Sequence, residues 1–311
     1  MSTISLINKN WNKIVLSCTS WFRVPELGME KFEVLSRGST FAVKADKSWE
    51  TNYHFFAPFH VTAPYLFPGY YPTDKYPWLQ AIHENHVIFT IELRDMMNGQ
   101  IIKRLGADNR LYSHPSKDVC VIHLNKEGQA LSELKEMGIS INPLELSKQP
   151  VQKGEKVLFL GHDLKEKYDE EKQEDVSILL PRKVPGQLLA ASNHRIFAKT
   201  EENLTQGMCG GPVVDSRGLC RGITEGIVSS MEDGLTVKDP FLQKKLENCG
   251  VFIESTELIP FIEDIEKQRC VGQEEIEQMM NKLDEESKIY IENLKKQKEE
   301  EDEANNSEPK I

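Results

Sequence analysis

Short apolar runs separated by turn-forming residues dominate residues 10–253 of the chain. Glycine, proline, asparagine and aspartate bound these runs, which predicts about a dozen strands with little helix among them. Many short strands at regular spacing are typical of a barrel or sandwich, and the count favours two barrels packed side by side. The predicted strands are residues 13–21, 31–38, 40–45, 53–58, 87–94, 119–124, 155–161, 186–192, 194–199, 212–216, 219–224, 226–230 and 251–255.

A linker and two inserts interrupt the predicted strands. Residues 138–156 are rich in proline, glycine and serine, and are expected to link a first barrel over 10–140 to a second over 150–255. The insert 62–85 holds prolines, which argue against a helix, and aromatic residues, which are expected to pack on another part of the protein. The charged residues 163–175 are predicted to form an exposed loop.

After residue 255 the pattern becomes helical. A packing helix is expected over 256–271, followed by an acidic helical tail over 272–311 with a disordered end. The apolar positions of this tail are spaced alternately four and three residues apart, as in a coiled-coil seam of about two and a half heptads. A serine, Ser287, lies within the seam. The tail is therefore expected either to pack on its own protein or stay in solvent, or to bind a protein partner.

The charge of the chain excludes several classes of partner. Its 49 acids exceed its 38 lysines and arginines, for a formal net charge of −11, and residues 272–311 alone hold 13 acids and 6 lysines. An acidic chain without a basic stripe is not expected to bind nucleic acid or an anionic membrane. No apolar run is long enough to predict a transmembrane helix.

The six cysteines include no Cys-x-x-Cys pair, which is typical of reduced thiols inside a cell rather than of a disulfide framework. We expect a cytoplasmic location, with mitochondria as the alternative because no acidic residue precedes Glu26. We expect no cofactor and no metal. Cys120 and His123 lie three residues apart in a predicted strand and would point to opposite faces.

Residues 205–216, TQGMCGGPVVDS, carry the strongest chemical signal. Gly207 and Gly210 permit backbone angles that other residues disfavour, so the amides of Gly207 and Cys209 could point into one pocket. Two such amides would stabilise an oxyanion beside a Cys209 nucleophile. The alternative is a tight turn into a strand that happens to contain a buried thiol.

A nucleophile also needs a base and a group that orients the base. His60 ends an apolar strand and precedes a loop, where a side chain can be exposed on a rigid scaffold. Asp118 directly precedes a strongly apolar strand, and a carboxylate there can turn inward. Each signal is weak alone, since aspartate often precedes strands in turns and most histidines are structural.

The order His60, Asp118, Cys209 resembles that of the chymotrypsin-like (trypsin-like, PA-clan) peptidases, and so do several local motifs. These are GSTFAV at 38–43, FFAPFHVTA at 55–63, KDVCVIHL at 117–124, GEKVLFLGH at 154–162 and GMCGGPVVDSRGLCRGITEG at 207–226. The closing segment 251–265 resembles the Deg/HtrA-like branch, and the resemblance covers about residues 10–265.

The resemblance implies an all-β fold, a chymotrypsin-like double six-stranded β-barrel followed by a C-terminal helix, with the active site between the barrels. It implies His60 as general base, Asp118 as the residue that orients it, and the amides of Gly207 and Cys209 as the oxyanion hole. Cellular members carry serine at the position of Cys209, whereas viral 3C-like proteases carry cysteine.

Two functions remain open at this point. A thiol beside an imidazole can form a thiolate–imidazolium pair, so an intracellular endopeptidase that works through an acyl-enzyme is chemically sound. The alternative is a catalytically inactive pseudoprotease that binds proteins as a scaffold, because a serine-to-cysteine change can also abolish activity.

The resemblance also implies where a protein or peptide substrate would bind. The walls of the specificity pocket would come from Asn203 and Gln206 before the nucleophile and from Thr224, Glu225 and Gly226 after it. The strand 222–228 could pair with an extended peptide by β-augmentation. Glu225 could favour a basic substrate residue, face solvent, or disturb the triad.

Overall fold

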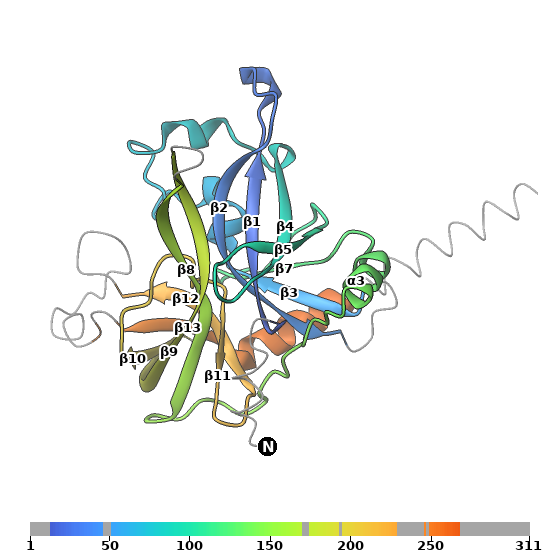
Figure 1. The fold of residues 1–311 in the computed structure, drawn as a ribbon. Coiled ribbons are helices and arrows are strands. Elements are labelled where there is room, and N and C mark those ends of the chain that lie inside the picture. The colour runs from blue at the N-terminus through green and yellow to red at the C-terminus, as the bar shows by residue number, and fades with distance from the viewer. Residues whose placement is uncertain are drawn as a thin grey trace, which may run out of the picture. The chain divides into compact units, whose positions relative to one another are not determined.

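The structure is a computed structural model that describes residues 13–45, 51–169, 174–192, 195–228, 246 and 249–267 (Figure 1). The chain divides into two units, residues 1–262 and 263–311, and all the described strands belong to the first. Residues 255–267 are helical, which confirms the predicted C-terminal helix. The predicted acidic tail over 272–311 lies outside the described residues.

The first group of strands is a seven-stranded antiparallel sheet in the order β5-β4-β1-β2-β3-β7-β6. Its strands are β1 Val15–Phe22, β2 Glu33–Lys44, β3 Tyr53–Ala57, β4 Val87–Arg94, β5 Ile101–Gly106, β6 Tyr112–Ser113 and β7 Cys120–Ile122. The sheet curls so that the chain at the end of β5 meets the chain after β7. There the amide of Asp108 donates to the carbonyl of His123 at 2.8 Å, and the amide of Asn125 donates to the carbonyl of Gly106 at 2.9 Å. Because these few bonds do not form a continuous ladder, the sheet is open, and the expected closed six-stranded barrel is wrong in detail.

The second group is a closed barrel in the order β10-β13-β12-β11-β8-β9. Its strands are β8 Lys156–Asp169, β9 Glu174–Ser192, β10 Arg195–Thr200, β11 Pro212–Val214, β12 Cys220–Ile227 and β13 Gly250–Glu254. Phe159 and Phe252 meet edge to face in its core, with their ring centroids 5.9 Å apart. The mostly-β architecture with a barrel, a second sheet and a C-terminal helix is as the sequence predicts.

Several elements differ from the sequence prediction. Most of the predicted loop 163–175 is strand, because β8 pairs with β9 from Lys156 to Asp169, and main-chain pairing satisfies hydrogen bonds whatever the side chains are. The edge strand β5 was not predicted, since it is largely exposed and lacks a clear apolar alternation. The two runs predicted between 31 and 45 share one strand, β2, and those predicted at 219–224 and 226–230 share β12, which ends at Ile227. Residues 229 and 230 lie outside the described residues. Helix α3, Glu127–Glu136, was also missed.

The connections are short helical turns. Helix α2, Phe59–Thr62, follows β3, and the single turns η2 Pro25–Leu27, η3 Pro64–Leu66, η4 Pro77–Ala81 and η5 Glu84–His86 lie in the loops. Three of these turns begin with proline, whose fixed φ and missing N–H suit the first helical position. None of the helices in the described ranges is long and apolar enough to cross a membrane.

Both faces of the first sheet are buried around β1. Leu16 and Cys18 point into the apolar core, and the alternate residues Ser17 and Thr19 point to the other side. There the hydroxyls of Ser17 and Thr19 donate to the carboxylate of Glu92 at 3.2 and 3.1 Å. Arg94 and Arg104 pair with the same carboxylate. This polar face continues to Ser39, whose hydroxyl accepts a bond of 2.9 Å from the amide of His162 in β8, so polar contacts join the two groups of strands.

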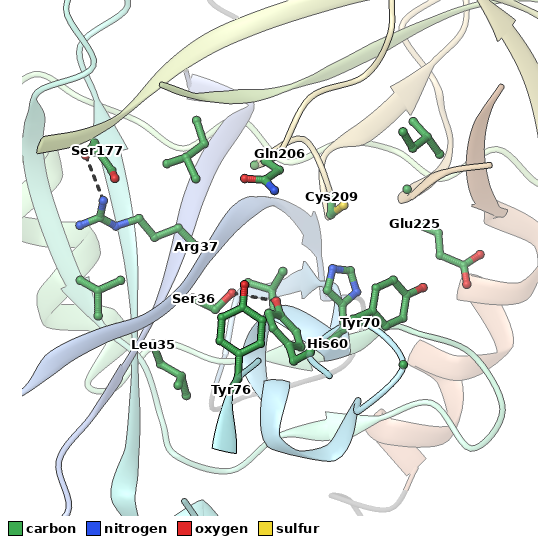
Figure 2. A pocket seen from close by; sticks show the side chains of 18 of the residues that line it. Leu35, Ser36, Arg37, His60, Tyr70, Tyr76, Ser177, Gln206, Cys209 and Glu225 are labelled. Carbon is green, nitrogen blue, oxygen red and sulfur yellow. Dashed lines mark hydrogen bonds between the residues drawn. The ribbon is translucent and has the colours of Figure 1, made fainter. Parts of the chain in front are cut away.

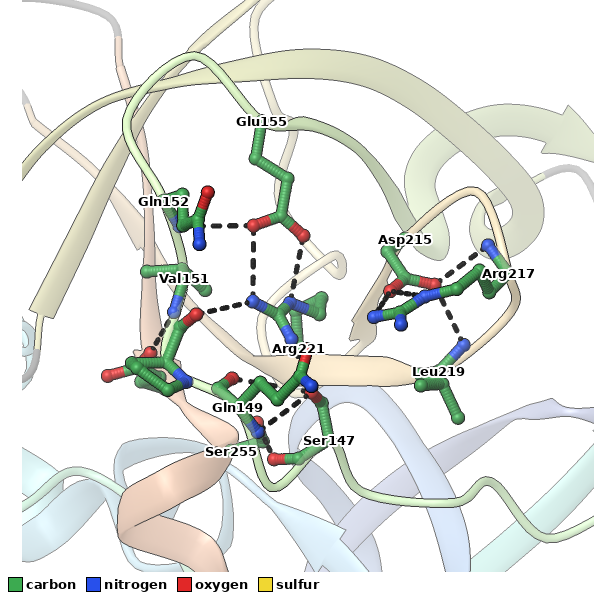
Figure 3. A network of polar contacts seen from close by, with 12 residues as sticks. Ser147, Gln149, Val151, Gln152, Glu155, Asp215, Arg217, Leu219, Arg221 and Ser255 are labelled. Atoms are coloured by element: carbon green, nitrogen blue, oxygen red, sulfur yellow. Dashed lines mark hydrogen bonds and ion pairs between the residues drawn. The ribbon is translucent and has the colours of Figure 1, made fainter.

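The predicted linker is bonded to both groups of strands. The amide of Leu144 donates to the carbonyl of Ala42 in β2 at 2.8 Å, and that of Ser147 to Cys220 in β12 at 2.9 Å. Arg221, which is only 2% exposed, is hydrogen-bonded to several residues of the linker (Figure 3). Its guanidinium donates to the Ser147 hydroxyl, to the Pro150 carbonyl at 3.0 Å and to the Glu155 carboxylate at 3.1 Å. The linker is thus an ordered part of the fold.

Candidate active site

The pairing of β3 with β7 brings His60 to Asp118. Ala57, the last residue of β3, pairs with Cys120, the first of β7, so the residues after β3 lie beside those before β7. The backbone amide of His60 donates to Oδ1 of Asp118 at 2.8 Å, and Nδ1 of its ring lies 2.5 Å from Oδ2. Both carboxylate oxygens are engaged, so the imidazole is held in one orientation.

Glycines shape the turn that carries Cys209. Gly207 and Gly210 have φ angles of 93° and 86°, which favour glycine. A Cβ on Gly210 would lie 2.1 Å from the carbonyl oxygen of Ser39, and one on Gly211 would lie 1.9 Å from that of Leu160. In the described parts of the chain, no group accepts a hydrogen bond from the amide of Gly207 or Cys209. Both residues line the cleft.

The imidazole of His60 is electrostatically perturbed. Burial by itself lowers the pKa of His60, but the hydrogen bond to Asp118, the neighbouring thiol of Cys209 and the charges of both outweigh it and raise this pKa from 6.5 to about 10. A protonated ring is therefore stabilised between an acid and a half-buried thiol. The structure thus brings together the three residues that the sequence singled out.

A cleft of about 920 Å³ opens in front of these residues (Figure 2). Residues 34–37 of β2, the insert, the nucleophile turn and the end of β12 line it. Among the predicted pocket residues, Gln206, Glu225 and Gly226 line the cleft. Asn203 is exposed and lies outside it. Thr224 is buried behind the cleft, where its carbonyl and amide bond at 2.8 Å to the amide of Gly210 and the carbonyl of Gly211.

Glu225 is not turned to solvent. Its side chain is 1% exposed, and its carboxylate accepts hydrogen bonds from Nε of Arg195 at 2.8 Å and from the NH2 group of the same guanidinium. Burial raises the pKa of Glu225, although Arg195 counters this effect. Because Arg195 already occupies both oxygens, Glu225 has little capacity left for a basic substrate residue.

The insert 62–85 forms one wall of the cleft and covers His60. The ring of Tyr70 stacks on the imidazole, with centroids 4.6 Å apart and planes 9° apart. Phe67 meets the imidazole edge to face at 6.2 Å. The sequence indicated only that the aromatic residues of the insert pack on another part of the protein, and two of them, Phe67 and Tyr70, pack on the candidate base itself.

Sequence reasoning also missed Ser39, which supports the nucleophile turn. Its hydroxyl donates to the carbonyl of Gly207 at 2.7 Å and its amide to the carbonyl of Cys209 at 2.8 Å. The same hydroxyl accepts from the amide of His162. Burial lowers the pKa of His162 to about 3, so this ring is neutral. The only signal in the sequence was the motif GSTFAV, whose serine had no assigned role.

We predict that replacing Ser39 with alanine lowers the free energy of unfolding by about 1–3 kcal/mol, because two buried main-chain groups lose their partner. Urea denaturation measures this loss. Ser36→Ala is the matched control, since the Ser36 hydroxyl contacts only the Tyr71 hydroxyl at 3.4 Å on the cleft rim. We expect the control to change stability by less than about 0.5 kcal/mol. Equal losses in both variants would contradict a special role for Ser39.

Within the described residues, no group of three or more histidine, cysteine, aspartate or glutamate side chains is arranged to hold a metal ion. No family model matches the sequence, and no curated protein matches it either. Among solved structures, the chain is similar to the Rv3671c protease from M. tuberculosis in its active form. The two share 14% sequence identity over 84% of this chain and 82% of that one, with a TM-score of 0.45.

Proposed function

We propose that this protein is an endopeptidase that hydrolyses peptide bonds with Cys209 as nucleophile, His60 as acid and base, and Asp118 as the residue that orients His60. One observation carries the proposal: the imidazole of His60 is hydrogen-bonded to Asp118 and lines the same cleft as Cys209, and these two neighbours raise its pKa. A histidine that stays protonated at neutral pH can hold a neighbouring thiol as thiolate.

The reaction proceeds in two steps. The sulfur of Cys209 attacks the peptide carbonyl carbon, and the amides of Gly207 and Cys209 bind the negative oxygen that forms. The C–N bond then breaks, the leaving amine takes a proton from His60, and a thioester remains. In the second step water gives a proton to His60 as its oxygen attacks the thioester. The C–S bond breaks, the acid leaves, and the thiolate–imidazolium pair is restored.

A peptide has a strand edge available beside the nucleophile. The pairing of β11 with β12 ends at Ile223, so no strand in the described residues covers that edge of β12 from Glu225 to Ile227. Glu225, Gly226 and Ile227 all line the cleft. An extended peptide can add to such an edge by main-chain hydrogen bonds. We place the part of the substrate before the cleaved bond here.

A second candidate is the inactive scaffold that binds proteins in the same cleft. The stacking of Tyr70 favours it, because this ring covers one face of the imidazole. Cleavage of a peptide by the wild-type protein, lost in Cys209→Ala, would eliminate this alternative.

Alkylation by iodoacetamide tests the proposed function. We expect Cys209 to react at least about tenfold faster between pH 6 and 8 in the wild type than in His60→Ala, because the variant has no imidazolium partner. Cys18, Cys120 and Cys220 should stay unreactive, since they are buried and burial raises the pKa of each thiol. His83→Ala, at an exposed histidine, is the control and should react like the wild type. An unchanged rate in His60→Ala would contradict the proposal.

A further inference from the structure

One cation that lines the cleft has no acidic partner among the described residues. Besides Cys209 and three tyrosines, the described lining includes four chargeable side chains, namely Arg37, His60, Arg195 and Glu225. Arg195 is neutralised by Glu225, and a protonated His60 is paired with Asp118. Arg37 forms no ion pair with any carboxylate in the described ranges.

The nearest acid cannot supply the missing partner. Glu92 is the one carboxylate that influences Arg37, but Arg94 and Arg104 already pair with it. Burial and the positive charge of Arg94 lower the pKa of Arg37, and the pull of Glu92 in the other direction is smaller. A guanidinium that is partly desolvated beside other cations gains more than usual from an added anion.

The guanidinium also has an unused donor. Its NH1 group donates to the carbonyl of Ser177 at 3.0 Å, which holds the side chain against β9. Its NH2 group makes no hydrogen bond in the part of the chain that the structure describes, and its Nε is unbonded as well but buried. A ligand in the cleft would therefore meet the terminal NH1 and NH2 groups. A carboxylate is the acceptor that matches these two groups, since it can take two parallel N–H bonds.

Arg37 and Glu225 lie on opposite sides of Cys209 (Figure 2). If the substrate residues before the cleaved bond lie along β12 near Glu225, the residues after this bond extend toward Arg37, Ser177 and Gln206. This placement rests on the proposed function.

We propose that Arg37 binds a carboxylate on the part of the peptide that follows the cleaved bond, so that the cleft selects an acidic residue or a free C-terminus there. The carboxylate would give an acidic partner to a cation that has none among the described residues. Arg37 is then a specificity-determining residue of this cleft.

Peptides with glutamate or glutamine at successive positions test the proposal. We expect wild-type kcat/KM to favour glutamate at one position after the cleaved bond by at least about tenfold, the range of a charge-assisted hydrogen bond. Arg37→Gln should abolish this ratio, and Arg37→Glu should reverse it in favour of lysine. Arg182→Gln is the control. Arg182, on β9, pairs with Glu202 and does not line the cleft, so this variant should keep the preference for glutamate.

A binding assay separates this inference from the proposed function. Fluorescence anisotropy with Cys209→Ala, which cannot turn over, should show glutamate peptides binding at least about tenfold more tightly, and Arg37→Gln should remove the difference. Peptides with free and amidated C-termini distinguish a terminal carboxylate from an acidic side chain as the bound group. Cleavage without any Arg37-dependent preference for a carboxylate would overturn the inference about Arg37 but not the proposed endopeptidase function. Arg37-dependent binding without wild-type cleavage would overturn the proposed function but not the inference about Arg37.

Discussion

Replacing Asp118 with asparagine is expected to lower kcat/KM for a cleaved peptide by about 10²- to 10⁴-fold, the usual contribution of an acid–base group. Asp118 accepts both the backbone amide and the ring Nδ1–H of His60. Asparagine has a single acceptor oxygen, so one of these two donors would face an NH₂ group instead. The imidazole would then lose its orientation or adopt the wrong tautomer.

The same substitution should shift the pH dependence in a defined direction. With the pKa of His60 at about 10, the imidazolium persists through neutral pH in the wild type. The neutral asparagine removes a negative charge and a hydrogen bond, so the pKa of His60 should fall toward 6.5. Because His60 must be protonated to give a proton to the leaving amine, the alkaline loss of kcat/KM should begin at lower pH in Asp118→Asn. NMR titration of the His60 ring and kcat/KM from pH 5 to 10 measure this shift.

Asp108→Asn provides the matched control, because Asp108 is exposed and its Oδ1 accepts only a turn hydrogen bond from the amide of Arg110. Its rate and pH profile should equal those of the wild type. If Asp118→Asn retains wild-type kcat/KM and an unchanged pH profile, Asp118 does not orient the base.

Replacing Arg221 with alanine is expected to lower the free energy of unfolding by about 3–5 kcal/mol, the cost of breaking a buried ion pair. Arg221 is among the largest fully buried side chains, and its Nε lies 3.0 Å from Oε1 of Glu155. The variant would leave a cavity and strip partners from Ser147, Pro150 and Glu155. Chemical denaturation with a fluorescence readout measures the loss.

Arg217, four residues before Arg221 and also drawn in Figure 3, is the matched control for the Arg221 substitution. Its side chain is 57% exposed and pairs with Asp215 at 2.8 Å. Because exposed pairs contribute little, Arg217→Ala should cost far less stability than Arg221→Ala. The double variant Arg221→Met with Glu155→Leu should recover part of the loss, since apolar residues can replace a buried pair. Similar losses in Arg217→Ala and Arg221→Ala would refute the importance of burial here.

Local chemistry made much of the candidate site predictable. Gly207 and Gly210 predict a turn whose backbone angles favour glycine. The apolar runs beside His60 and Asp118 place these two residues next to strand ends. The register of β3 with β7 then follows from which faces are apolar, because a shift by one residue would expose the core. Elements with no such pattern were missed, as in the exposed edge strand β5 and the charged hairpin of β8 with β9.

The sequence by itself determined the mostly-β class, the strands that lie next to His60 and Asp118, and the glycine turn at Cys209. These features depend on residue type and on neighbours a few positions away. Only the tertiary structure decided that Arg195 pairs with Glu225, that Tyr70 covers His60, that Ser39 supports Gly207, and that Arg37 has no carboxylate partner among the described residues. Each of these depends on side chains from segments far apart in sequence, and such pairings are set by how the sheets curl and pack rather than by any local pattern.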